Sequence, residues 1–209
     1  MTSIEHLIFD FDGTISNSYP IFMTIVHDFA KEKGLPIPVD DDTLFRALNI
    51  TVKYAIELME WDKQVSYQDF LDFFYEQQAL RAKEFCAFPE AVELLEYAQK
   101  RGKHCYIYTH TGSVVSQMLQ NMGIFHYFDF ILDGSYGFPA KPCPDALNFF
   151  SKKLGLDPQS CMMIGDRPID AQAGMNAGMH GCLWDSYGFF EDEHVDYKVK
   201  RLSEIKYYI

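Results

Sequence analysis

The sequence predicts an α/β protein in which a parallel sheet, covered by helices on both faces, carries an all-helical insertion after its first strand. Beyond about residue 85, short apolar runs alternate regularly with amphipathic stretches of helical period, whereas residues 18 to 84 show helical periodicity alone. Parallel strands need crossover connections that place helices on the faces of the sheet, so regular alternation indicates a parallel sheet.

The first strand is expected at residues 4 to 10, an apolar run that ends in Asp10-Phe11-Asp12-Gly13-Thr14 and opens into a turn at Gly13. The helical stretch that follows has apolar residues on shared helix faces, for example Ile21, Phe22, Ile25, Val26 and Phe29. Breakers at 34 to 38 separate the first helix of this stretch from the second.

The remaining elements are placed by period and by the glycines that end helices. We expect strands at 104–108, 128–132, 161–164 and 180–184, and helices at 90–101, 113–122, 144–154 and 168–177. A chain of 209 residues, 48% of them hydrophobic, is long enough for one such domain with a sizeable insertion.

Polar residues gather at the predicted strand ends, where parallel sheets bind ligands. They are Asp10, Asp12, Thr109, His110, Lys141, Gly165, Asp166 and Asp170. Four carboxylates at one edge would repel one another unless a divalent cation neutralised them. Oxygen ligands with room for water favour Mg²⁺, so we expect a metal site of Asp10, Asp12, Asp166 and Asp170, with Asp170 either a weaker ligand or a partner that orients Lys141.

Asp10 and Asp12 can divide the work of phosphoryl transfer because side chains two apart on an extended strand end point the same way. Asp10 would attack phosphorus and become an aspartyl phosphate. Asp12 would protonate the leaving alkoxide and then deprotonate the hydrolytic water.

Other strand-end residues suit the binding of a phosphate group. Gly13 allows a sharp turn beside the nucleophile, and Thr109 can donate to a phosphoryl oxygen. Lys141 supplies a compact positive charge. His110 is interpreted either as a structural imidazole or as a phosphate contact, and Arg167 as a solvated residue.

Together these motifs resemble those of the haloacid dehalogenase superfamily of phosphohydrolases, in the phosphoglycolate phosphatase-like branch. The matching segments are Phe9-Asp10-Phe11-Asp12-Gly13-Thr14, Tyr108-Thr109-His110, Lys141-Pro142 and Ile164-Gly165-Asp166-Arg167-Pro168-Ile169-Asp170. The resemblance implies a Rossmann-like catalytic core at 1–15 and 85–209 and a helical cap at 16–84. It also implies a metal held by the Asp10 side chain, the Asp12 backbone carbonyl and Asp166.

The composition and charge of the chain limit the classes of partner that the protein is expected to have. A formal net charge of -12 without a basic stripe argues against nucleic acid, so a small phosphorylated metabolite is the expected partner. No segment is apolar enough for a bilayer, and the start of the chain lacks the features of a signal peptide, so we expect no membrane association and a cytoplasmic location. The oligomeric state is left open.

Two other functions fit the same motifs. A sugar-phosphate mutase of the β-phosphoglucomutase type would use the same aspartyl phosphate, because the cap decides whether water or a sugar hydroxyl reaches it. A non-catalytic binding protein on the same fold is the second alternative. A calcium loop starting at Asp10 is disfavoured, because Ile15 and Ile21 stand where that loop needs glycine and glutamate.

Overall fold

The computed structural model describes residues 3–209, which fall into two compact units. One unit contains the chain up to residue 16 together with 87–209, and the other contains 17–86. Where the chain passes from one unit to the other, Ser16 and Ala87 form an antiparallel bridge. The roles expected for these parts, a catalytic core at 1–15 and 85–209 and a cap at 16–84, stay predictions.

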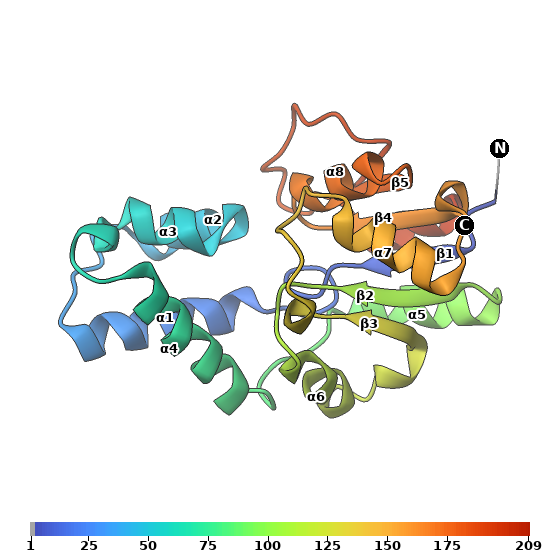
Figure 1. The fold of residues 1–209 in the computed structure, drawn as a ribbon. Coiled ribbons are helices and arrows are strands. Elements are labelled where there is room, and N and C mark those ends of the chain that lie inside the picture. Colours follow the sequence, from blue (N-terminus) through green and yellow to red (C-terminus); the bar gives the residue numbers. More distant parts are fainter. Residues whose placement is uncertain (1–2) are drawn as a thin grey trace. The chain divides into compact units, whose positions relative to one another are not determined.

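The larger unit is built on a six-stranded sheet in the order β3-β2-β1-β4-β5-β6, with every neighbouring pair parallel (Figure 1). The strands are β1 (His6–Phe9), β2 (His104–Tyr108), β3 (Phe128–Leu132), β4 (Cys161–Gly165), β5 (His180–Trp184) and β6 (Tyr197–Val199). The predicted fold class, a Rossmann-like α/β sheet, is confirmed.

Three strands differ from the sequence-based expectation, and of these β4 only extends one residue further, to Gly165. β6 was not predicted, because three residues are too few to show a period, and it forms by pairing with β5. β1 ends at Phe9 rather than at residue 10, although the Asp10 N–H still donates to the Ile164 carbonyl at 2.8 Å. Asp10 therefore lies at the point where the strand opens into the turn.

Helices bury both faces of this sheet. Ile8 packs in a cluster with Phe150 of α7 and Ala173 of α8, while Leu7 and Phe9 point to the opposite face and are equally buried. The connections between strands contain α5 (Pro89–Lys100), α6 (Val114–Asn121), α7 (Asp145–Leu154), α8 (Pro168–Asn176) and the 3₁₀ turns η2 (Phe125–Tyr127), η3 (Gly134–Tyr136) and η4 (Pro158–Ser160). A further 3₁₀ turn, η5 (Leu202–Tyr207), follows β6.

The smaller unit is all-helical. Its elements are α1 (Tyr19–Lys33), α2 (Asp41–Ile50), α3 (Val52–Leu58), η1 (Trp61–Lys63) and α4 (Tyr67–Leu80). Phe29 of α1 meets Phe70 of α4 edge to face, with ring centroids 5.0 Å apart, and the Trp61 indole N–H donates to the Pro36 carbonyl at 2.7 Å. Aromatic packing of this kind gives a unit of 70 residues its own core.

Within residues 3–209, no helix is both long and apolar enough to cross a lipid bilayer.

The strand order fixes where a ligand site can form. From β1 the chain first adds β2 and β3 on one side, and then returns to place β4 on the other side of β1. The carboxyl ends of β1 and β4 therefore flank the point where the winding reverses, which is where open parallel sheets bind ligands. Asp10 follows β1, and Asp166 follows β4.

Candidate active site

Lys141 is a buried cation at the centre of the candidate site. Its Nζ donates to Asp10 Oδ1 at 2.7 Å, to Asp170 Oδ1 at 2.8 Å and to the Tyr108 carbonyl at 3.0 Å. The same Nζ lies 4.5 Å from the centre of the Tyr108 ring. Three acceptors use the three N–H groups of the ammonium, so its direction is fixed.

Asp170 holds Lys141 and closes the start of α8 at the same time. One carboxylate oxygen accepts from Lys141, and the other accepts from the Arg167 backbone N–H at 3.1 Å. Gly165 makes room for it, because a Cβ at that position would lie 2.2 Å from the Asp170 Cβ. Both oxygens of Asp170 are thus engaged, which is the geometry of a residue that orients the lysine.

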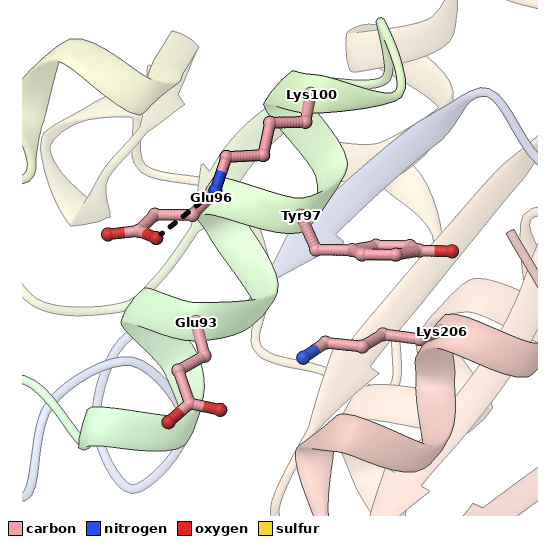
Figure 2. Close-up of a pocket in the computed structure, with 5 residues that line it drawn as sticks. All are labelled: Glu93, Glu96, Tyr97, Lys100 and Lys206. Atoms are coloured by element: carbon pink, nitrogen blue, oxygen red, sulfur yellow. Dashed lines mark ion pairs between the residues drawn. The ribbon is translucent and has the colours of Figure 1, made fainter.

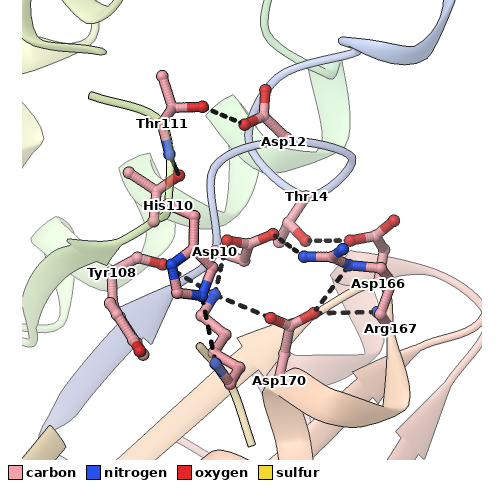
Figure 3. A network of polar contacts seen from close by, with 11 residues as sticks. Asp10, Asp12, Thr14, Tyr108, His110, Thr111, Asp166, Arg167 and Asp170 are labelled. Carbon is pink, nitrogen blue, oxygen red and sulfur yellow. Dashed lines mark hydrogen bonds and ion pairs between the residues drawn. The ribbon is translucent and has the colours of Figure 1, made fainter. Parts of the chain in front are cut away.

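Asp10, Asp166 and Asp170 form a carboxylate cluster in which one oxygen of each lies within 4.8 Å of the others. In the described part of the chain this is the one group of three or more such ligands. The Thr14 hydroxyl donates to Asp166 Oδ1 at 3.2 Å (Figure 3). Asp10 Oδ2 is buried and has no hydrogen-bond partner among residues 3–209.

Burial and the neighbouring charges shift the pKa values of these groups in opposite directions. Burial raises the pKa of Asp10 to about 6, although Lys141 acts against it. For Asp170, Lys141 and Arg167 outweigh burial and hold the pKa below its ordinary value. The two carboxylates likewise raise the pKa of Lys141, against the effect of burial. Near neutral pH the site therefore holds a charged lysine and ionised carboxylates.

Arg167 lies at this site, so its interpretation as a solvated residue was wrong. Its side chain is only 20% exposed, with NH2 3.9 Å from Asp10 Oδ2 and Nε 3.8 Å from Asp170 Oδ2. Burial raises the pKa of Asp10, and the guanidinium of Arg167, like Lys141, acts against this rise. The sequence signal was its place between Asp166 and Asp170, since the residue that precedes a helix after a buried strand faces the same edge.

The side chain of Asp12 is not part of the carboxylate cluster. Its Oδ2 accepts a hydrogen bond from the Thr111 hydroxyl at 2.5 Å. The buried Thr109 accepts from the Thr111 N–H at 3.1 Å through its own hydroxyl oxygen, which leaves the hydroxyl proton able to donate to a ligand. Thr111 was missed by the sequence analysis, although its position two residues after Thr109 could have indicated it.

Gly13 takes the backbone conformation that the sequence analysis expected of the turn. Its φ is 81°, in the region that side chains disfavour, and its N–H donates to the Ser16 carbonyl at 2.8 Å. The turn folds back directly after Asp10 and Asp12. Within this turn the Thr14 N–H donates to the Phe11 carbonyl at 3.4 Å, while the Thr14 hydroxyl donates to Asp166.

His110 acts as a support for the lysine loop. Its Nε2 accepts the Lys141 backbone N–H at 3.2 Å, which requires a ring without a proton on that nitrogen. Burial, helped by Lys141 and Arg167, lowers its pKa to about 4. The ring is therefore neutral at pH 7, and the structural interpretation of His110 gains a definite partner.

We expect His110 to make the protein acid-sensitive. Between about pH 6.5 and pH 4 the unfolded chain binds a proton at this ring while the folded chain does not, so stability falls as the pH falls. The loss should approach about 2 to 3 kcal/mol at pH 4. Urea unfolding at pH 7 and pH 4.5 measures it.

His110→Gln, which keeps an acceptor, should lose less stability over this range, whereas the exposed His194→Gln should behave as the parent protein. Equal acid sensitivity in the parent and in His110→Gln would contradict the assignment.

A separate surface pocket lies between α5 and η5 and is lined by Glu93, Glu96, Tyr97, Lys100 and Lys206 (Figure 2). Lys100 pairs with Glu96 at 3.7 Å, and Lys206 lies 5.5 Å from the centre of the Tyr97 ring. None of these residues takes part in the carboxylate cluster. The chemistry points to the sheet edge and not to this pocket.

Comparison with known proteins agrees with this geometry. The model of the haloacid dehalogenase-like hydrolase family matches residues 7–183, which extends from within β1 to within β5 and includes every residue of the cluster. The chain belongs to the haloacid dehalogenase-like hydrolase family. It is therefore an enzyme of the hydrolase class, as the sequence motifs indicated.

Relatives with assigned names indicate which branch of the family the chain resembles. The chain is 27% identical to a phosphoglycolate phosphatase of Vibrio cholerae over 93% of this chain and 90% of that protein. It is 25% identical to an N-acetylmuramic acid 6-phosphate phosphatase of Pseudomonas aeruginosa over 84% of this chain and 79% of that protein. The expected resemblance to the phosphoglycolate phosphatase-like branch is confirmed.

Solved structures share the fold. A crystal structure described as a predicted phosphoglycolate phosphatase from Haemophilus somnus superposes with a TM-score of 0.82 at 22% identity, covering 99% of this chain and 98% of that one.

Proposed function

We propose that this protein is a Mg²⁺-dependent phosphatase that hydrolyses a small phosphate monoester through an aspartyl phosphate on Asp10. The observation that carries the proposal is the buried Asp10 carboxylate at the sheet's switch point. Lys141 donates to one of its oxygens, and the other accepts no hydrogen bond from the described residues 3–209. The larger unit, expected at 1–15 and 85–209, would be the catalytic core, and 16–84 would be the cap.

The residues at this edge fit a divalent cation. Asp10, Asp166 and Asp170 bring three carboxylates together with two cationic side chains, Lys141 and Arg167, so negative charge is in excess. All the side-chain donor atoms are oxygens, which hard cations such as Mg²⁺ prefer. Asp10 and Asp166 would hold the ion, since both oxygens of Asp170 are engaged elsewhere.

Asp12 would contribute to this metal site through its backbone carbonyl, because its side chain bonds to Thr111. When bound, Mg²⁺ would neutralise charge at the phosphoryl group and favour the ionised form of the neighbouring carboxylates.

The chain's own residues supply the chemistry. An Asp10 oxygen forms a bond to phosphorus as the ester P–O bond breaks, and Asp12 gives a proton to the departing alkoxide oxygen. Asp12 then takes a proton from the water that attacks the aspartyl phosphate, which releases inorganic phosphate and restores Asp10. Lys141 and the Thr109 hydroxyl would bind phosphoryl oxygens, with Gly13 keeping the turn close to them.

The substrate is proposed from chemistry and from the relatives. Two relatives carry names of phosphatases acting on phosphoglycolate and on a sugar phosphate, so small phosphorylated metabolites of these kinds are the proposed substrates. The mutase alternative, the absence of nucleic-acid and membrane partners, and the cytoplasmic location stay predictions. The non-catalytic alternative disagrees with the membership of a hydrolase family.

A panel of phosphate esters tests the proposal. Phosphoglycolate, hexose 6-phosphates, N-acetylmuramic acid 6-phosphate, nucleotides and pyrophosphate are incubated with the protein, and released phosphate is measured. We expect hydrolysis of at least one ester, loss of the activity after chelation with EDTA, and its return with Mg²⁺ but not with Ca²⁺. Glucose 1-phosphate is included, and its conversion to glucose 6-phosphate without phosphate release would favour the mutase.

Failure to hydrolyse any ester under these conditions, or full activity after chelation, would overturn the proposal.

A further inference from the structure

Thr111 lies in the turn after β2, and its backbone is held from two sides. Its N–H donates to the Thr109 hydroxyl at 3.1 Å, and its carbonyl accepts the Gly134 N–H at 2.9 Å. Gly134 approaches so closely that a Cβ there would lie 2.2 Å from the His110 carbonyl oxygen. The turn is therefore braced by the segment that follows β3.

The Thr111 side chain reaches from this braced turn to Asp12. Its hydroxyl donates to Asp12 Oδ2 at 2.5 Å, across 99 positions of the sequence (Figure 3). The residue itself is only 4% exposed. This distance is typical of a hydrogen bond from a hydroxyl to a carboxylate. Because the donor is also buried, the bond restricts rotation of the Asp12 carboxylate.

We infer that Thr111 is a positioning residue that holds the Asp12 carboxylate in the direction needed to protonate the leaving oxygen. The inference deepens the proposed function and rests on it. Because the hydroxyl donates to Oδ2, the proton passed to the leaving alkoxide is carried by Oδ1. Thr111 would thus decide both the direction of the carboxylate and which of its oxygens delivers the proton.

If Thr111 has this role, the effect of losing its contact with Asp12 depends on the leaving group of the substrate. An alkyl phosphate leaves as a strongly basic alkoxide and needs a proton in the transition state, whereas p-nitrophenyl phosphate leaves as a stabilised phenolate and needs little. Loss of the contact should therefore slow the formation of the aspartyl phosphate selectively for the alkyl ester. A threonine that merely supported the fold would affect both esters alike.

The experiment compares Thr111→Val, which keeps the shape of the side chain and removes the hydroxyl, with Thr111→Ser, which keeps the hydroxyl. The substrates are p-nitrophenyl phosphate and the best alkyl phosphate of the panel above. For Thr111→Val we expect kcat/KM on the alkyl ester to fall about 10- to 100-fold, part of the roughly 10²- to 10⁴-fold that positioned proton transfer supplies.

For p-nitrophenyl phosphate we expect kcat/KM to stay within about threefold of the parent protein, because kcat/KM reports the steps up to aspartyl phosphate formation, in which the phenolate needs little help from a proton. The kcat values do not make this distinction, because Asp12 also takes the proton from the water that hydrolyses the intermediate, whichever ester formed it. Thr111→Ser should keep most of the activity on both esters.

A double-mutant comparison isolates the partner. In an Asp12→Asn background, Thr111→Val should cause no further loss on the alkyl ester, because residues that act as a unit give non-additive effects. Additive losses would show that Thr111 does not act through Asp12. Should Thr111→Val fail to fold, as judged by circular dichroism, Thr111→Ala replaces it in every comparison.

Equal losses of kcat/KM on both esters, an equally impaired Thr111→Ser, or a fully active Thr111→Val would each overturn the inference, while an inactive Asp10→Asn leaves the proposed function standing. An active Asp10→Asn protein would instead remove the proposed function itself.

Discussion

Replacing Asp10 with Asn is expected to abolish turnover while the protein remains folded. The amide cannot attack phosphorus, and loss of a catalytic nucleophile costs at least about 10⁴-fold in kcat. The fold should tolerate the change because Lys141 keeps Asp170 and the Tyr108 carbonyl as partners. Removing a carboxylate whose pKa burial raises to about 6 also removes part of the cost of burying a charge.

Phosphate release from the best ester, measured with saturating Mg²⁺, checks this result, and circular dichroism checks the fold. Asp192→Asn is the matched control, since this exposed aspartate lies outside the site and should leave kcat unchanged. Magnesium-dependent activity in Asp10→Asn at more than a trace of the parent value would exclude the aspartyl phosphate mechanism.

Replacing Lys141 with Met is expected to damage both activity and stability. The lysine is the shared partner of two buried carboxylates, and breaking a buried pair by removing one member costs about 3 to 5 kcal/mol. Loss of a positive charge aimed at the transferred phosphoryl group should also lower kcat by about 10²- to 10³-fold. Urea unfolding at pH 7 and phosphate release measure the two effects.

Two further variants separate these effects. Lys152→Met, an exposed lysine on α7, should change neither quantity by a measurable amount. Adding Asp170→Asn to Lys141→Met should restore part of the stability, because one unpaired buried charge is removed, but it should not restore activity. Full stability in the single variant would contradict the ion-pair geometry.

The predicted strands show why the local sequence was sufficient to predict most of the fold. Phe128–Leu132 and His180–Trp184 form strands with the bounds expected, because a short apolar run between two helical stretches is typical of a strand in a parallel sheet. Tyr197–Val199 was not predicted, because its strand state depends on the free edge of β5 and not on its own pattern.

The contacts of the polar residues at the strand ends could be predicted from the sequence to different degrees. The sequence identified Asp10, Lys141 and Asp166 as neighbours because each follows a strand of the same parallel sheet. It left the behaviour of Asp170 open, and the structure shows both of its oxygens engaged, one by Lys141 and one by the Arg167 N–H. Such a pattern depends on side-chain directions that spacing does not encode.

By itself the sequence determined the alternation of strands and helices, the all-helical segment and the polar residues that end the strands, because period and burial are local properties. Only the tertiary structure decided that β1 lies between β2 and β4, which brings Asp10 to Lys141 across 131 positions and Asp12 to Thr111 across 99. It also brought Arg167 to the site. Contacts of this kind depend on strand order and side-chain packing, and no local pattern specifies either.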